Sequence, residues 1–133
     1  MKKLLITLLL IASSALQAQQ WTPVAKDVEG TVSSLDWSTL RKEGNLRRIW
    51  SMDNYSEKKP SMLLSDSTGI FSSRFRTEFD CKNERQRTLS YTAFSEKDLG
   101  GKNMQQNDSP GFFVDVAPGT VAWKLMEEVC KAK

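Results

Sequence analysis

Polar and apolar residues alternate most clearly between Phe71 and Cys81. Successive side chains of a β-strand point to opposite faces, so this alternation predicts a strand with one apolar face and one solvated face. The predicted buried side carries Phe71, Ser73, Phe75, Thr77, Phe79 and Cys81, and the solvated side carries Ser72, Arg74, Arg76, Glu78 and Asp80.

Three shorter strands are expected before this one, at residues 21–24, 31–35 and 46–55. Residues 36–45 are expected to contain a loop that ends in the turn pair Gly44-Asn45. Residues 56–67 are charged and rich in serine, and they indicate a surface connection with a short extended piece at residues 62–64.

A turn at residues 82–84 is expected to reverse the chain into a further strand at residues 85–94. With a three-residue loop, Tyr91 lies opposite Phe75 and Leu89 lies opposite Thr77, and Arg87 lies near Phe79. The glycine-rich and amide-rich residues 95–110 indicate a long mobile loop, and residues 112–116 indicate one more strand.

The C-terminal segment has the spacing of an amphipathic helix, with Thr120 as the expected N-cap after Pro118-Gly119. Its opposite side carries Lys124, Glu127, Glu128 and Lys131, so the helix is expected to dock by one face. The apolar stripe consists of Val121, Ala122, Leu125, Met126, Val129 and Cys130.

The two cysteines, Cys81 and Cys130, lie on the apolar faces of the predicted strand and of the predicted helix. Both thiols therefore point to the same interior, which favours a disulfide bond in an oxidising compartment. The alternative is a pair of reduced, buried thiols.

The first residues have the pattern of an export signal, with Lys2 and Lys3 before the apolar residues 4–12. Cleavage is expected after Ala18, which leaves residues 19–133 as a single domain; cleavage after Ala15 is the weaker alternative. The apolar run is shorter than the about 20 residues that span a bilayer. Because no cysteine follows the signal to carry a lipid, we expect no membrane anchor.

The chain contains no histidine, which removes the commonest general base and the usual nucleophile pairs. Two distant cysteines do not make a zinc site, and we expect no metal and no other cofactor. Glu78 with Asp80, and Glu127 with Glu128, are carboxylate pairs that we interpret as solvated faces. An enzyme is therefore not expected.

Arginines are the remaining candidates for recognition. Arg74, Arg76 and Arg85 are predicted to form a protein-binding surface across one hairpin, with a solvated or ion-paired face as the default alternative. The net charge of +3 includes the two lysines of the signal, so it does not favour a nucleic-acid partner. Core packing is favoured over an exposed binding role for Trp21, Trp37 and Trp50. Trp123 is the exception, because Lys124 and the acidic pair place it near the edge of the buried stripe of the helix.

One set of residues and short motifs is spread over nearly the whole chain after the signal: Trp21, Gly44-Asn45, Arg47 to Trp50, Phe79-Asp80-Cys81, Arg85, Arg87, Pro118-Gly119-Thr120 and Cys130. This pattern resembles the surface-adhesin protein E family of Gram-negative bacteria. The resemblance implies an α+β fold: a twisted antiparallel sheet of about six strands, with one C-terminal helix held on its concave face by the disulfide. It also implies dimerisation and adhesion to host matrix and plasma proteins, without a cofactor.

Two functional hypotheses follow. The first is an exported, non-enzymatic binding protein for a protein ligand, located in the periplasm or secreted because an anchoring cysteine is absent. The alternative is a small periplasmic inhibitor or accessory protein that blocks an enzyme such as a host lysozyme through one inserted loop.

Overall fold

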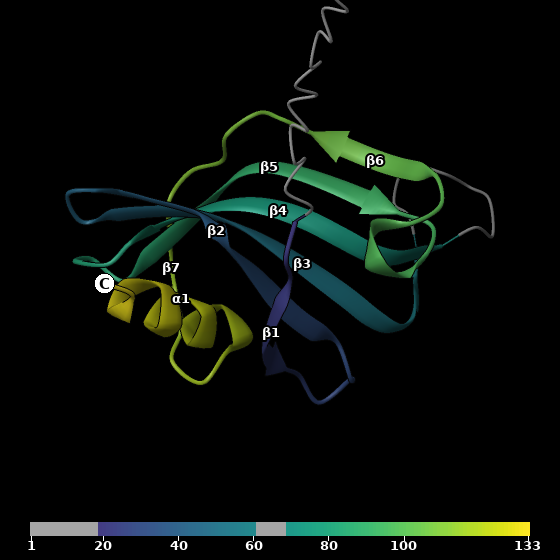
Figure 1. Ribbon diagram of the computed structural model, residues 1–133, viewed down its shortest axis with the longest axis horizontal. Helices are drawn as coiled ribbons and strands as arrows, with labels where there is room; N and C mark the ends of the chain where they lie inside the picture. The colour runs from purple at the N-terminus through teal and green to yellow at the C-terminus, as the bar shows by residue number, and fades with distance from the viewer. Residues whose placement is uncertain (1–18, 61–68) are drawn as a thin grey trace, which may run out of the picture.

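A computed structural model describes residues 19–60 and 69–133, so the expected signal at residues 1–18 and the extended piece at residues 62–64 lie outside the described residues. The described chain forms a seven-stranded antiparallel sheet in which β1 to β6 follow one another in sequence order and β7 pairs with β5. Figure 1 shows this arrangement. The strands are β1 (Thr22–Lys26), β2 (Val32–Glu43), β3 (Leu46–Lys59), β4 (Ile70–Asp80), β5 (Arg85–Phe94), β6 (Asn103–Asn107) and β7 (Val114–Asp115).

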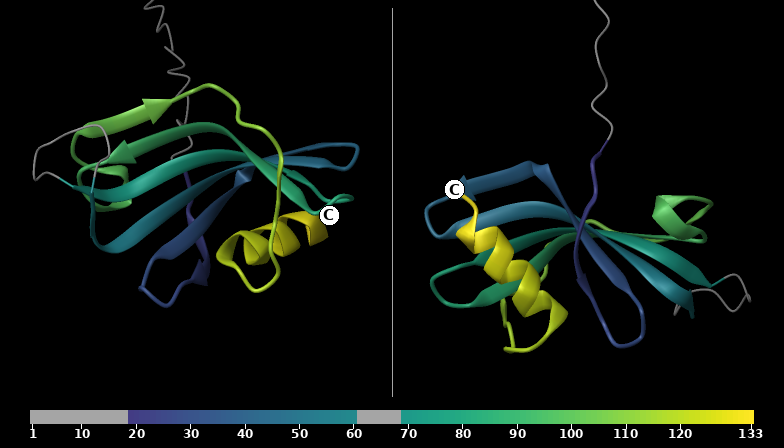
Figure 2. Two further views of the ribbon diagram at one scale, coloured as in Figure 1. Left: turned by 180° about the vertical axis from the view of Figure 1, so that it is seen from behind. Right: turned by 60° about the horizontal axis from the view of Figure 1, so that its bottom comes forward.

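The helix α1 (Val121–Lys131) lies against one face of the sheet, which curves around it (Figures 1 and 2). Thr120 is its N-cap, as predicted, and the Thr120 Oγ1 accepts a hydrogen bond from the Trp123 backbone N–H at 3.1 Å. Leu125, Met126 and Val129 are buried. Among residues 19–60 and 69–133, no helix is long and apolar enough to cross a lipid bilayer.

The main core lies between α1 and the face of the sheet that we call the helix face. This face carries Leu35 of β2, Ile49 of β3 and Phe79 of β4, all of them almost fully buried against the helix. A second cluster, around Ile70, Ala93 and Met104, lies apart from the main core. The predicted fold class is confirmed.

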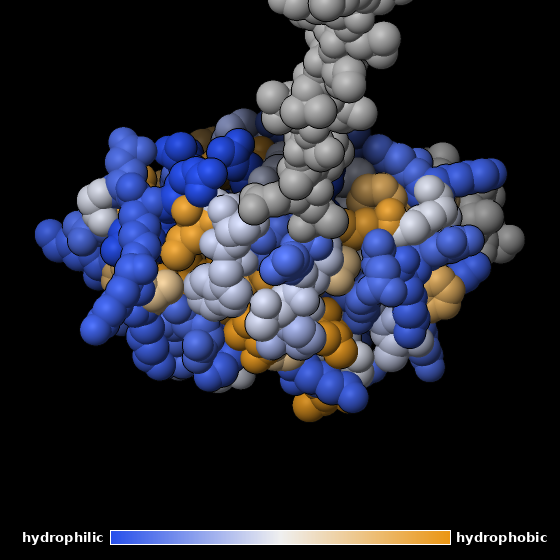
Figure 3. Space-filling model, in the orientation of Figure 1, coloured by the Kyte–Doolittle hydropathy of each residue, from blue (hydrophilic) through white to orange (hydrophobic). Residues whose placement is uncertain are grey.

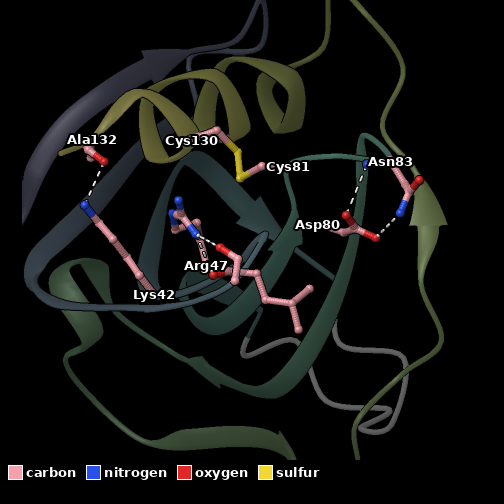
Figure 4. The surroundings of a disulfide bond; sticks show 9 residues. Lys42, Arg47, Asp80, Cys81, Asn83, Cys130 and Ala132 are labelled. Carbon is pink, nitrogen blue, oxygen red and sulfur yellow. Dashed lines mark hydrogen bonds between the residues drawn. A yellow bond between two sulfur atoms is a disulfide. The ribbon is translucent and has the colours of Figure 1, made fainter.

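The disulfide between Cys81 and Cys130 is present, with the two Cα atoms 5.8 Å apart. It joins the residue after β4 to the last turn of α1, as Figure 4 shows. Beside it, the Lys42 Nζ donates a hydrogen bond to the Ala132 carbonyl oxygen at 2.8 Å, which ties the end of the chain to β2. The C-terminal end of the helix is therefore held by a covalent bond and by a hydrogen bond.

The strand β2 is longer than expected, because most of the predicted loop at residues 36–45 is extended chain. The pairing of β2 with β3 shifts between Asp36 and Arg41. Thr39 holds this bulge: its Oγ1 donates to the Asp36 carbonyl at 2.6 Å and accepts from the Trp50 backbone N–H at 3.0 Å. The side chain of Thr39, one of the polar residues that suggested a loop, thus replaces part of the regular backbone hydrogen bonding between β2 and β3. The turn at Gly44-Asn45 is as predicted, and β3 extends beyond residue 55 to Lys59.

The predicted register between β4 and β5 is correct at one end and wrong at the other. Tyr91 pairs with Phe75, and their ring centroids are 5.1 Å apart. A bulge then leaves Leu89 without a partner, so that Thr88 pairs with Thr77. Beyond the bulge, Arg87 pairs with Glu78 and not with Phe79. The four-residue connection between Asp80 and Arg85 accounts for this shift of one residue.

Residues 95–110 are not a continuous loop, because they contain the 3₁₀ turn η1 (Lys97–Leu99) and β6. The Ser72 Oγ accepts a hydrogen bond from the Leu99 backbone N–H at 2.9 Å and holds η1 against β4. Met104 anchors β6 by burial in the second cluster. The strand expected at residues 112–116 has only two residues, and the Phe112 side chain is 94 % exposed.

Replacing both cysteines by serine is expected to lower the free energy of unfolding by about 4 kcal/mol, because the bridge closes a segment with a sequence separation of 49. Chemical denaturation of the oxidised wild type and of the Cys81→Ser/Cys130→Ser variant measures this difference. Equal midpoints for the two proteins would contradict it.

Candidate functional site

The face of the sheet opposite α1, which we call the outer face, gathers charged and aromatic side chains from β3 and β4. Arg48 pairs with Glu78, and Trp50 pairs with Arg76, so these four residues project to one side. Figure 3 shows that hydrophilic side chains cover most of the visible surface, with smaller apolar patches between them.

Glu78 is the centre of the outer face and is fully buried. Its Oε2 forms an ion pair with the Arg48 Nε, and its Oε1 lies 2.7 Å from the Arg87 Nη2. Burial raises the pKa of Glu78, but the hydrogen bonds from Arg48 and Arg87 outweigh burial and hold the pKa below its ordinary value. The carboxylate therefore stays charged and serves as the anchor of two arginines.

The interpretation of Glu78 and Asp80 as a solvated pair was therefore wrong. Both carboxylates are buried, at 0 % and 6 % exposure. The shift of one residue in β5 places Arg87 opposite Glu78 and Arg85 opposite Asp80, so each carboxylate has an arginine as its cross-strand partner. Alternation along β4 cannot reveal this pairing.

Asp80 organises the β4–β5 turn. It accepts hydrogen bonds from the Asn83 backbone N–H at 3.1 Å, from the Asn83 Nδ2 at 2.8 Å and from the Arg85 Nη2 at 3.0 Å. The hydrogen bonds from the Asn83 and Arg85 side chains lower the pKa of Asp80 to about 2. The guanidinium groups of Arg85 and Arg87 lie 5.3 Å and 4.7 Å from the centroid of the Phe113 ring.

The predicted arginine surface is therefore divided. Arg85 is held by Asp80 and Phe113, whereas Arg74 lies over the Trp50 ring with its guanidinium carbon 4.8 Å from the centroid. Arg76 is exposed beside them. Within residues 19–60 and 69–133, neither Arg74 nor Arg76 forms an ion pair.

Two hollows of about 340 Å³ and 510 Å³ adjoin on the outer face, because both are lined by Arg48, Trp50 and Arg76. We call them together the outer groove. The first hollow is also lined by Gln19, Asp36, Ser38, Thr39, Arg41 and Ile49, and the second by Arg87, Leu89, Ser90, Asp108 and Pro110.

Asp36 lines the first hollow and is fully buried. Its Oδ1 accepts hydrogen bonds from the Ser38 backbone N–H at 3.1 Å and from the Ser38 Oγ at 2.5 Å. Its Oδ2 is buried without a hydrogen-bond partner in the described part of the protein. A buried acceptor of this kind is costly unless a donor reaches it.

Sequence reasoning missed Asp36, Arg48 and Trp50 as members of this site. The sequence pattern places Asp36 in a loop and favours core packing for Trp50, but Trp50 is only half-buried and lies on the outer face. Alternation along β3 is the signal that could have found Arg48 and Trp50, because both have the parity that is opposite to the buried Ile49.

A third hollow, of about 280 Å³, lies on the helix face beside the first turn of α1. Its acidic residue, Asp53, accepts a hydrogen bond from the Ser33 Oγ at 2.6 Å, and burial raises its pKa. Across the described ranges, no three residues with metal-binding side chains lie together. Arginine and tryptophan, which are enriched among the residues that dominate protein interfaces, distinguish the outer groove from this third hollow.

Glu78→Gln is expected to lower the free energy of unfolding by about 2 to 3 kcal/mol, because it removes the buried charge that pairs with Arg48 and Arg87. The matched control is Glu128→Gln, which removes an exposed pair with Lys124 and is expected to cost less than about 1 kcal/mol. Urea denaturation compares the two variants. Similar decreases in the free energy of unfolding for the two variants would show that the buried ion pairs of Glu78 contribute no more than the exposed pair of Glu128.

The stability of the protein is expected to fall as the pH decreases from about 4 towards 2. The pKa of Asp80 is lower in the folded protein than its ordinary value of 3.8, so its stabilisation is complete above that value and is lost as the folded carboxylate takes up a proton. Asp80→Asn is expected to flatten this part of the curve of stability against pH. An NMR titration that placed the Asp80 midpoint near its ordinary value would contradict the expectation.

Comparisons with known proteins agree with this fold. The family model for surface-adhesin protein E matches residues 21–131. Crystal form II of Haemophilus influenzae protein E is similar with a TM-score of 0.63 at 11 % identity, covering 83 % of this chain and 86 % of that one. A second structure of Haemophilus influenzae protein E gives 0.61 at 11 % identity, with 83 % of each chain covered.

Protein E from non-typeable Haemophilus influenzae gives a TM-score of 0.54 at 12 % identity, covering 83 % of this chain and 74 % of that one. A search of curated proteins finds no match. These structural likenesses show the fold, and the family model spans nearly all of the described residues. The chain therefore belongs to the surface-adhesin protein E family.

Proposed function

We propose that residues 19–133 form an exported, non-enzymatic binding module that attaches to a host protein through the outer groove. The observation that carries this proposal lies between the two adjoining hollows, where Trp50 is the cross-strand neighbour of the exposed Arg76. Among the described residues, Arg76 forms no ion pair. Membership of an adhesin family supports binding as the activity.

The outer groove is suited to protein binding because its main side chains are held in place before a partner arrives. Arg74 packs over Trp50, and the buried carboxylate of Glu78 holds Arg48 and Arg87. Side chains that are already ordered lose little entropy on association, which favours affinity. Arg76 alone of these arginines is largely exposed, so its guanidinium is free to form a bidentate contact.

The predicted binding residues are accordingly revised. Arg74 and Arg76 stay in the proposed surface, Arg48 and Trp50 join it, and Arg85 is left out because Asp80 and Phe113 occupy its guanidinium.

Export is part of the proposal. The disulfide supports it, because such bonds persist in oxidising compartments such as the periplasm or the exterior of the cell. The signal at residues 1–18 and the dimerisation implied by the family resemblance stay predictions.

Purified residues 19–133 are expected to bind at least one member of a panel of immobilised host matrix and plasma proteins. Arg76→Glu is expected to weaken that binding about tenfold, because it removes a charged hydrogen-bond donor and adds a repulsive charge. The control is Lys131→Glu, which changes the charge equally at an exposed position on α1, an element of the opposite face.

Two results would contradict the proposal. One is the absence of binding to every protein of the panel. The other is a dose-dependent loss of lysozyme activity without such binding, which would favour the inhibitor hypothesis instead.

A further inference from the structure

We infer that the outer groove binds an extended acidic peptide segment, with a carboxylate on Arg76 and a backbone N–H on the buried Oδ2 of Asp36. This inference rests on the proposed function and names the chemistry of the partner that the groove would select. Three observations support it: the charges of the groove, the Asp36 Oδ2 that lacks a hydrogen-bond donor within the described residues, and the shape of the groove.

The charges of the groove favour an anion at its centre. Arg48 and Arg87 share the carboxylate of Glu78, and Arg48 also lies 3.5 Å from the Glu43 Oε2, but Arg76 has no ion-pair partner among the described residues. Arg41, which also lines the first hollow, is exposed and, within the described ranges, donates only to the carbonyl oxygens of Ser38 and Leu40, at 3.4 Å and 3.0 Å. Two guanidinium groups that form no ion pair within the described residues therefore border the same hollow.

The Oδ2 of Asp36, at the edge of this region, favours an anionic ligand that also carries a hydrogen-bond donor. The Oδ2 of Asp36 is buried and has no partner among the described residues, although Asp36 lines the hollow that Arg41 and Arg76 border. A ligand that carried only negative groups would leave this oxygen without a donor and would be repelled by it. A peptide supplies a backbone N–H next to each acidic side chain, so it satisfies the arginines and Asp36 together.

The shape of the groove favours a linear chain. The two hollows share their middle, at Arg48, Trp50 and Arg76, and continue in one direction to Asp36 and in the other to Asp108 and Pro110. The middle is thus positive and aromatic, and each end offers a carboxylate that can accept from a backbone N–H. An extended peptide has this alternation of acidic side chains and backbone donors along its length.

The probe is a fluorescein-labelled synthetic peptide of alternating glutamate and alanine, added to purified residues 19–133 and followed by fluorescence anisotropy. The peptide is expected to bind, the same peptide with glutamine in place of glutamate is not, and the affinity is expected to fall as salt is added. In NMR spectra, the indole N–H signal of Trp50 is expected to shift more than those of Trp21, Trp37 and Trp123.

Single-residue variants separate the contributions of Arg76 and Asp36 to peptide binding. Arg76→Glu is expected to weaken peptide binding about tenfold, whereas Lys131→Glu leaves it unchanged. Asp36→Asn keeps an acceptor for Ser38 but replaces the free oxygen by a donor, and it is expected to weaken binding severalfold although it removes a negative charge. Tighter binding by Asp36→Asn would overturn the role given to the Asp36 Oδ2.

Three other results would overturn the inference: equal binding of the glutamate and glutamine peptides, binding that leaves the Trp50 signal unmoved, or binding of a sulfated oligosaccharide at Trp50 without any binding of the peptide. If the peptide does not bind but a protein of the host panel still does, the inference fails and the proposed function stands. If neither binds, both fail.

Discussion

The packing of α1 against the helix face is the interaction on which the rest of the structure depends. In the described chain, one helix of 11 residues packs against part of a seven-stranded sheet, and Leu125, Met126 and Val129 supply its buried contacts. So small a contact gives a modest core, and the bridge between Cys81 and Cys130 compensates by restricting the unfolded chain. Because the bridge joins the end of β4 to the last turn of α1, it also fixes where the helix lies on the sheet.

Among the described residues no α-helix covers the outer face, which is stabilised differently. Long arginine side chains cover the strands there, and buried carboxylates hold their guanidinium groups, as Glu78 holds Arg48 and Arg87. This arrangement satisfies charges that would otherwise be costly to bury. On the same face, Arg74 packs over Trp50, whereas Arg76 is exposed and forms no ion pair within the described residues.

Much of the fold could be predicted from the sequence because it depends on local periodicity. The alternation from Phe71 to Cys81 located β4, and the spacing of Val121, Leu125 and Val129 located α1 and its buried stripe. These two patterns together predicted the disulfide, because each directs one cysteine to the interior. The family resemblance added the antiparallel sheet of about six strands and the position of the helix on it, and the structure confirms both.

The sequence by itself determined which residues of a strand share a side, and it determined the amphipathic helix at the C-terminal end. It also determined that Cys81 pairs with Cys130. Only the tertiary structure decided which residues face one another across strands. The bulge at Leu89 moves Arg87 from Phe79 to Glu78, and the bulge after Asp36 places Arg41 opposite Arg48. The physical reason is that side-chain alternation depends on the backbone of one strand, whereas register depends on turn length and bulges, which neighbouring strands settle together.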